Sequence, residues 1–166
     1  MAENEIQNAE NEQQEAQQPV FQMQRCYLKD ASLEMPNAPQ ILMRPQQEQP
    51  QVDIQFEVSQ AVVQENLFDV TVRGTITVKA GEHTIILVEG KQSGLFVIQN
   101  IPQEAVQHVT NVLCPTMVYP YLRGNLADLM TRANVPPVHL PEVNFEMLYQ
   151  QRLAQQAAQA DAAKAS

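Results

Sequence analysis

Apolar and polar residues alternate with a period of two along four stretches of the first hundred positions. The stretches are residues 20–29, 52–59, 68–78 and 83–89. Successive side chains of a β-strand point to opposite faces of a sheet, so this alternation is typical of a half-buried strand. The second stretch shows it most plainly, since Val52, Ile54 and Phe56 alternate with charged or amide residues. The pattern predicts four strands.

The connections between these stretches indicate how the strands pair. Residues 80–82 (Ala-Gly-Glu) predict a tight turn, which brings the fourth strand back antiparallel to the third. Gly90 and Gly94 interrupt the fourth strand, and we expect residues 95–98 to extend it past a bulge. Residues 31–50 hold four prolines and predict a long loop without regular structure. Three hairpin-linked strands and a fourth reached by this loop favour an antiparallel, Greek-key-like sheet.

A helical period replaces the strand pattern in the second half of the chain. Apolar residues recur three or four positions apart at Val118, Leu122, Leu126, Leu129 and Ala133. They define one broad apolar face, which must be buried. Proline removes a backbone donor and crowds the preceding turn, so the helix that begins near Pro102 should restart at Pro115 or bend near Pro120. Asn134 can close this helix.

A proline-rich segment and a second helix follow. Residues 135–141 contain three prolines, which hold the segment in an extended path and exclude a helix. Asn144 is a good N-cap for the next helix. The apolar stripe of that helix consists of Phe145, Leu148, Tyr149 and Leu153. The sequence therefore predicts two helices joined by a stiff strap.

The two ends of the chain differ from the middle in composition. Residues 1–19 carry five acidic residues and no Lys or Arg, and the whole chain has a formal net charge of -9. Neither these residues nor the Ala- and Gln-rich residues 154–166 bury enough apolar area to offset the cost of ordering. We therefore expect a disordered N-terminal tail at 1–19, one domain at 20–153 and a flexible C-terminal tail at 154–166.

Cysteine content and charge limit the compartment and the partners. Cys26 and Cys114 are too few for a disulfide framework and favour a reducing compartment. The sequence shows neither a secretory signal nor an apolar run long enough to span a membrane. We expect a soluble cytoplasmic protein without direct membrane insertion. Its negative charge argues against nucleic acid as a partner and is compatible with a basic protein surface.

No pattern of catalytic or ligand-binding residues stands out. The histidines, His83, His108 and His139, fall in a strand, a helix and a loop without metal-ligand spacing. Gly90-Lys91 is not a phosphate loop, because Ile85 stands where the first glycine is required. We expect no metal, no cofactor and no enzyme activity.

Several short motifs follow one another along the chain. They are residues 21–25 (FQMQR), 29–34 (KDASLE), 36–39 (PNAP), Cys114-Pro115 with Tyr119-Pro120-Tyr121 shortly after, and 141–145 (PEVNF). In this order they resemble the SecB family of bacterial protein-export chaperones. Separate motifs in a fixed order are more specific than any one of them. The resemblance covers residues 21–153.

The resemblance implies an α+β subunit with two helices packed on one face of a four-stranded antiparallel sheet, assembling as a dimer of dimers. It also implies an ATP-independent holdase that binds unfolded precursor proteins, keeps them competent for translocation and delivers them to the export motor SecA. In the family an acidic, outward-facing sheet surface docks SecA, and the matching residues here are Asp30, Glu34, Leu87 and Glu89. From the residues alone, Asp30, Glu34 and Glu89 can just as well be solvated charges on a sheet face.

Chains of this family hold unfolded precursors in an exposed apolar groove. The candidates here are Leu42, Met43, Phe56, Leu140, Phe145 and Tyr149, and for each the competing interpretation is core packing. The acidic, Gly-containing tail that is common in the family has no counterpart in residues 154–166. Two other functions stay open: a structural adaptor for a single folded partner, and a small enzyme with an unrecognised site.

Overall fold

The computed structural model describes residues 18–45 and 49–164. The elements are β1 (Val20–Glu34), α2 (Gln40–Met43), β2 (Gln51–Gln64), β3 (Leu67–Ala80), β4 (His83–Gln99), α3 (Gln103–His108), a π-helical turn η1 (Val109–Leu113), α4 (Cys114–Arg132) and α5 (Phe145–Lys164). The predicted N-terminal tail lies outside the described residues, except for Gln18 and Pro19.

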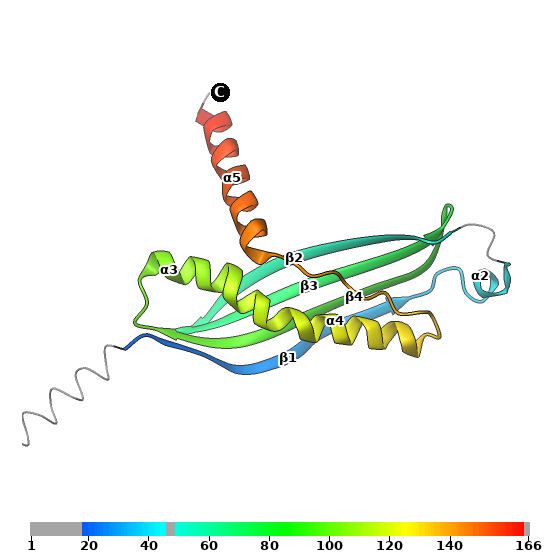
Figure 1. Ribbon diagram of the computed structural model, residues 1–166, viewed down its shortest axis with the longest axis horizontal. Helices are drawn as coiled ribbons and strands as arrows, with labels where there is room; N and C mark the ends of the chain where they lie inside the picture. Colours follow the sequence, from blue (N-terminus) through cyan, green and yellow to red (C-terminus); the bar gives the residue numbers. More distant parts are fainter. Residues whose placement is uncertain (1–17, 46–48, 165–166) are drawn as a thin grey trace, which may run out of the picture.

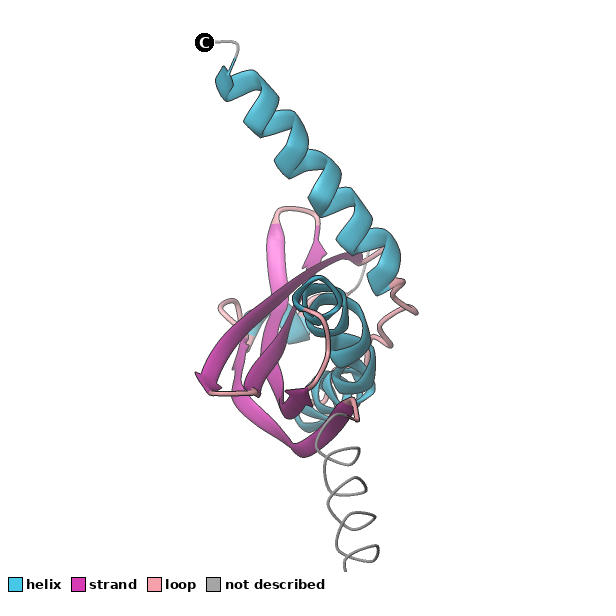
Figure 2. Cartoon of the chain, turned by 90° about the vertical axis from the view of Figure 1, so that its left-hand side faces the viewer, coloured by secondary structure: helices cyan, strands magenta, loops and turns pink. Residues whose placement is uncertain are grey.

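The four strands form one antiparallel sheet in the order β1-β4-β3-β2. Hairpins join β2, β3 and β4, whereas β1 pairs with the outer side of β4 and connects to β2 through the long segment that contains α2 (Figure 1). The helices α3 and α4 form a second layer on one face of the sheet (Figure 2). The predicted α+β class and the four antiparallel strands are confirmed.

Strand β1 is longer than predicted. It continues to Glu34, five residues beyond the expected end at Lys29, because β4 offers partners as far as Leu87. Two register shifts, at Met23/Arg25 and Leu28/Asp30, let β1 follow β4 over this length. The prediction of a structureless segment at 31–50 was therefore wrong for the end of β1 and for α2.

The glycines of β4 do not interrupt the strand. Gly90 lies directly opposite Gly74 of β3, and both lie beneath α4. A Cβ atom on Gly90 would lie 2.9 Å from Leu126 Cδ2, and one on Gly74 would lie 3.1 Å from Leu122 Cδ2. The expected interruption at Gly90 and Gly94 was wrong, because both pair in register with β1 and β3. Gly90 and Gly74 instead give α4 room to approach the sheet.

The helix changes type in front of Pro115. In η1 the N–H of Cys114 donates to the carbonyl of Val109, five residues back, and α4 then starts with proline in its first turn. The backbone stays helical through Leu113 and Cys114, so α3, η1 and α4 run on without a break, and the change in hydrogen-bond pattern falls directly before Pro115. The predicted restart at Pro115 is therefore replaced by a π-helical turn, and Pro120 lies inside α4.

The sheet and α4 share one hydrophobic core. Its fully buried helix residues are Val118, Leu122, Leu126 and Met130, which face buried β3 and β4 residues such as Ile76, Ile86 and Phe96. Along much of β3 and β4 every second residue is buried, as the period of two predicted. The helix face predicted from the spacing of apolar residues is therefore the face that packs on the sheet.

Two asparagines fix the ends of the strap. Asn134 has φ 58, and the next residue, Val135, donates its N–H to the carbonyl of Met130 at 3.1 Å, which closes α4. Asn144 caps α5, because its Oδ1 accepts from the N–H of Met147 at 3.0 Å. Both predicted helix boundaries are confirmed.

Helix α5 lies differently from the prediction. It projects away from the sheet (Figures 1 and 2), and Phe145 is its one buried residue among those described. It also continues past Leu153 to Lys164, because Ala and Gln are good helix formers even without an apolar face. The prediction that both helices pack on one sheet face is wrong for α5. Flexibility of residues 154–166 stays a prediction, and residues 165–166 lie outside the described part.

Candidate functional site

An aromatic chain connects the sheet, α4 and α5. The ring of Tyr119 lies 5.6 Å from that of Phe56 on β2 and 5.6 Å from that of Phe145 on α5, both edge to face. The Tyr119 hydroxyl donates to the carbonyl of Pro141 at 2.5 Å, and burial raises the pKa of this tyrosine. Arg123 reaches Glu142 at 2.6 Å. Tyr119 and Arg123 therefore fix the end of the strap and the start of α5.

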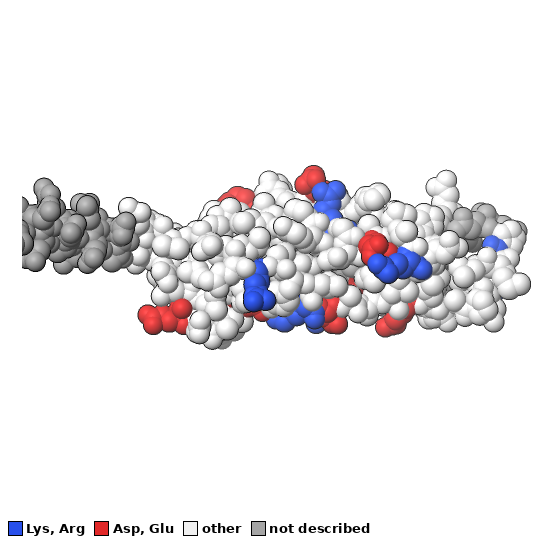
Figure 3. Space-filling model, turned by 90° about the horizontal axis from the view of Figure 1, so that it is seen from below, with Lys and Arg blue, Asp and Glu red and all other residues white. Residues whose placement is uncertain are grey.

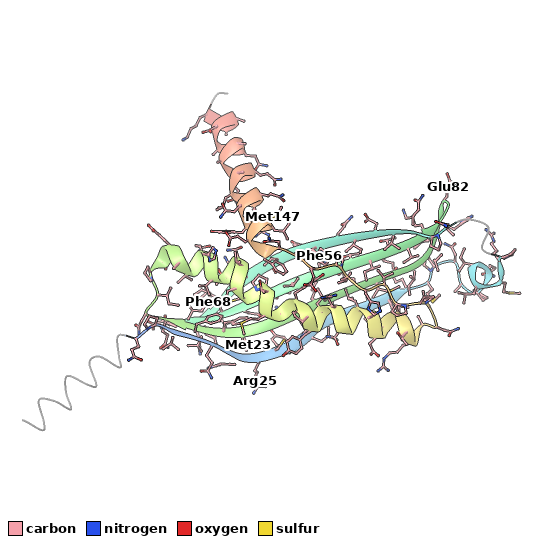
Figure 4. The ribbon with its side chains drawn as sticks, in the orientation of Figure 1. Met23, Arg25, Phe56, Phe68, Glu82 and Met147 are labelled. Atoms are coloured by element: carbon pink, nitrogen blue, oxygen red, sulfur yellow. The ribbon has the colours of Figure 1, made fainter. Side chains whose placement is uncertain are left out.

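Beside this chain lies a hollow of about 230 Å³ between β2, η1 and α5, which we call the α5 hollow. Its lining consists of Phe56, Val58, Asn111, Phe145, Leu148, Tyr149, Gln151, Arg152 and Gln155. Figure 4 shows Phe56 on β2 and Met147 at the base of α5, at this junction. The lining therefore combines aromatic and aliphatic side chains with amides and one guanidinium group.

Polar contacts hold the first turns of α5 over this hollow. His108 Nε2 lies 2.5 Å from Glu146 Oε2, and Arg152 donates to Asn111 Oδ1 at 3.2 Å. The hydrogen bond from Gln150 and then that with His108 lower the pKa of Glu146. Only Phe145 anchors α5 by burial, so the wall that this helix contributes depends on few contacts.

A second hollow, of about 500 Å³, lies at the opposite end of the strap, and we call it the hairpin hollow. It is lined by Ile41, Leu42, Arg44, Pro45, Ala80, Gly81, Glu82, His83, Ile85, Asn134, Val135 and Pro136. Figure 4 shows Glu82 at the tip of the β3–β4 hairpin, at the far end of the sheet from Met147. The strap therefore runs from one hollow to the other.

The six predicted groove residues do not form one continuous groove. Phe56, Phe145 and Tyr149 line the α5 hollow, and Leu42 lines the hairpin hollow. Met43 lines neither hollow and is 81% exposed, while Leu140 is only 1% exposed and belongs to the core. The assignment of Leu140 to the client-binding groove was therefore wrong, because the path of the strap places this side chain in the core. The remaining lining of the hairpin hollow was missed, since its members come from three separate segments.

The free edge of β2 lies beside the α5 hollow. β2 pairs with β3 alone, and this ladder runs without irregularity from Gln51 to Val62. Val62 and Val63 are strongly exposed at the far end of the strand. The other edge strand, β1, carries two bulges, which disturb pairing with an added strand. β2 therefore offers the more regular edge for an extended polypeptide.

The sheet face opposite α4 carries an ordered grid of side chains, which we call the outer face. Register places Asp30, Lys91, Arg73 and Glu57 in a first row across β1, β4, β3 and β2. A second row consists of Ser32, Glu89, Thr75 and Gln55, and a third of Glu34, Leu87, Thr77 and Asp53. The four residues predicted to dock SecA, namely Asp30, Glu34, Leu87 and Glu89, all lie in this grid.

Cations inside the grid neutralise part of its negative charge. Arg73 lies 2.6 Å from Glu89 and 3.4 Å from Glu57, and Lys91 lies 3.8 Å from Asp30. The hydrogen bond from Arg73 is the main cause that lowers the pKa of Glu89. On the side of the molecule seen in Figure 3, acidic and basic side chains are likewise interspersed. The outer face therefore carries cations among the acidic residues that the resemblance implied.

Other kinds of site find little support in the described residues. Within residues 18–45 and 49–164, no three or more His, Cys, Asp or Glu side chains are grouped to hold a metal ion. Burial raises the pKa of the Cys114 thiol to about 12, so it stays protonated near neutral pH. None of the helices in this part of the chain combines the length and hydropathy of a membrane span.

The subunit leaves open a free strand edge, two hollows lined by both polar and apolar side chains, and a charged sheet face, which are features that suit a protein that binds other polypeptides. Residues 14–156 match the family model described as preprotein translocase subunit SecB. The chain belongs to the SecB family, and its role is that of a chaperone in protein export.

Individual relatives agree with this assignment. The protein-export protein SecB of Acidovorax sp. (strain JS42) is 52% identical over 145 residues, which cover 87% of this chain and 93% of the relative. That of Paraburkholderia xenovorans (strain LB400) is 47% identical over 150 residues, 90% of this chain and 95% of the relative. The fold is similar to a SecB-like chaperone of Mycobacterium tuberculosis solved with a ChAD peptide from an antitoxin, with TM-score 0.61 and 18% identity over 74% of this chain and 90% of that chain.

Proposed function

We propose that the protein is an ATP-independent holdase of the cytoplasm, which binds unfolded precursor proteins and delivers them to SecA. The observation that carries the client-binding part is the regular free edge of β2 beside the aromatic α5 hollow. Main-chain pairing accepts any sequence, and an adaptable hollow lined in part by aromatic side chains adds affinity for bulky side chains. Together they suit a protein that must bind many unfolded chains without recognising one sequence.

The direct test is suppression of aggregation. Several unrelated unfolded proteins are diluted from denaturant with increasing amounts of this protein, without nucleotide, and light scattering is followed. A holdase suppresses scattering for all of them in proportion to its concentration. An adaptor for a single folded partner suppresses none or one, and that outcome would remove the holdase proposal.

Replacing Tyr149 with serine should weaken client binding about tenfold, because a half-buried aromatic wall of the α5 hollow is lost. Met147→Ser is the matched control, since Met147 is exposed on the same helix and lines neither hollow. Leu42→Ser tests the hairpin hollow in the same way. Binding of a fluorescent unfolded client and the urea unfolding midpoint are measured together. If Tyr149→Ser instead lowers the unfolding midpoint strongly, Tyr149 is a core residue.

We also propose that SecA docks on the outer face, at Asp30, Glu34, Leu87 and Glu89. All four lie in neighbouring rows of one exposed sheet face, and the face lies away from both hollows. A client and the motor can therefore bind the same subunit together. The strand order β1-β4-β3-β2 supports a Greek-key description of the sheet that carries this face.

Assembly as a dimer of dimers is supported by apolar side chains that the subunit leaves exposed. Leu28 of β1, Leu113 and Tyr121 are each more than two-fifths exposed. Such residues are expected to be covered by neighbouring subunits. Sedimentation should give the mass of a tetramer at micromolar concentration, and Tyr121→Asp should lower it. A stable monomer in the parent chain would contradict the assembly.

A further inference from the structure

We propose that Lys91 limits the affinity of the outer face for the motor by competing with the motor's basic groups for Asp30, and that it thereby favours binding of those groups at the third row of the grid. This inference rests on the proposed docking of SecA. Lys91 was not among the docking residues predicted from the sequence. It is central in the first row, on the strand that also carries Leu87 and Glu89.

The net negative charge of the grid increases from the first row to the third. The first row carries Asp30, Lys91, Arg73 and Glu57, two negative and two positive charges, and is neutral. The second row carries one negative charge, at Glu89, which lies 2.6 Å from Arg73, and the third carries two, at Glu34 and Asp53. A basic partner surface is thus attracted most strongly to the third row and gains less from the first, where Asp30 is shared with Lys91.

Contacts within the first row support its weaker attraction for a basic partner. Lys91 Nζ lies 3.8 Å from Asp30 Oδ2, and the two side chains are 39% and 60% exposed. A cation of the partner must share Asp30 with Lys91, and it is repelled by that ammonium group. Lys29, Arg73 and Lys91 also line a hollow of about 310 Å³ beside this row, together with Glu57, and each of the three cations lies within ion-pair distance of an acidic residue.

The acidic residues of the third row have no such competitor. Among the described residues, neither Glu34 nor Asp53 has a Lys or Arg within ion-pair distance, and both are exposed. Asp53 accepts a hydrogen bond from Gln55 at 3.1 Å. It lies three strands from Glu34, about 14 Å at the usual strand spacing, with Leu87 and Thr77 between them. This row fits a partner with two basic groups that flank an apolar contact, and it adds Asp53 to the docking surface.

The test is a titration of purified SecA against the tetrameric protein and its variants at low salt. Lys91→Gln should raise the affinity about threefold, because it removes an exposed repulsive charge. Arg132→Gln is the matched control, since it also removes one cation from an exposed ion pair, that with Asp128 on α4. It makes the same change in net charge away from the outer face and should leave the affinity unchanged.

Variants of the third row complete the test. Asp53→Asn and Glu34→Gln should each lower the affinity about threefold, while Glu65→Gln, at the β2–β3 turn, should not change it. The differences should shrink in high salt. If Lys91→Gln lowers the affinity or matches Arg132→Gln, Lys91 is no competitor and the inference is wrong. If Asp30→Asn, Glu34→Gln and Glu89→Gln all bind SecA like the parent chain, the docking proposal itself fails and takes this inference with it.

Discussion

Replacing Gly90 with valine is expected to lower the free energy of unfolding by about 3 kcal/mol, the upper end of the usual cost of overpacking a core. The first atom of the new side chain alone would lie 2.9 Å from Leu126 Cδ2 and 3.2 Å from Leu122 Cδ1. Both leucines are fully buried, so neither has room to move aside. The variant must either push α4 away from the sheet or distort β4.

Matched glycine variants separate this effect from a general loss of backbone freedom. Gly74→Ala should cost less than Gly90→Val, because its single carbon meets the leucines at 3.1 Å. Gly124→Ala, on the exposed side of α4, meets nothing within 4 Å and should stabilise the helix by up to about 1 kcal/mol. Urea unfolding with the assembly state checked in parallel gives all three values. A Gly90→Val protein as stable as the parent would show that α4 does not contact the sheet at this point.

The sequence was sufficient for features that depend on neighbouring residues. The period of two in β2 and β3 reflects one buried and one open face, and a strand shows this pattern whatever lies on the other side. Asn134 and Asn144 terminate helices through bonds made within a few residues of themselves. These are local effects, and they were predicted correctly.

Features that depend on contacts between distant segments were not predictable in this way. Gly90 was predicted to interrupt a strand, because the sequence does not show that α4 packs directly above it. The direction of α5 depends on one buried residue, Phe145, and on a few polar contacts to the α3–η1 segment. Its helical propensity gives no information about where such a helix lies.

The same distinction between local features and contacts of distant segments applies to the candidate surfaces. The acidic residues of the outer face were predicted as a set, but the pairing of Arg73 with Glu89 follows from the register of β3 against β4. Leu140 and Phe145 are both apolar residues near the end of a strap, and pattern alone cannot decide which faces a hollow. In the structure Leu140 is enclosed by the core, whereas Phe145 lies both in the core and along the α5 hollow.

Phe145 therefore connects stability to client binding, and its replacement by alanine is the most informative change in α5. We expect Phe145→Ala to lower the free energy of unfolding by about 3 kcal/mol, the lower end of the range for a buried phenylalanine, because a helix end relaxes more easily than the centre of a core. The loss includes the edge-to-face contact with Tyr119 at 5.6 Å. Leu153→Ala is the control, since Leu153 is 40% exposed on the same helix and lines neither hollow.

Phe145→Ala should destabilise α5 more than it destabilises the rest of the subunit. Without Phe145, the helix keeps the edge-to-face contact of Tyr149 with His108 at 6.0 Å and polar contacts such as His108 to Glu146 and Arg152 to Asn111. Exposed polar contacts of this kind contribute little. Amide hydrogen exchange in the first turns of α5 should therefore become much faster, while exchange in β3 and β4 rises only as far as the global loss of stability requires. The affinity for unfolded clients should fall as α5 loses its protection, because α5 forms one wall of the α5 hollow. Phe145→Leu should restore most of the protection by refilling the buried space. If the rate of amide hydrogen exchange in α5 is the same in Phe145→Ala as in the parent chain, contacts other than those of Phe145 are sufficient to hold the helix. The α5 hollow is then a fixed feature of the subunit.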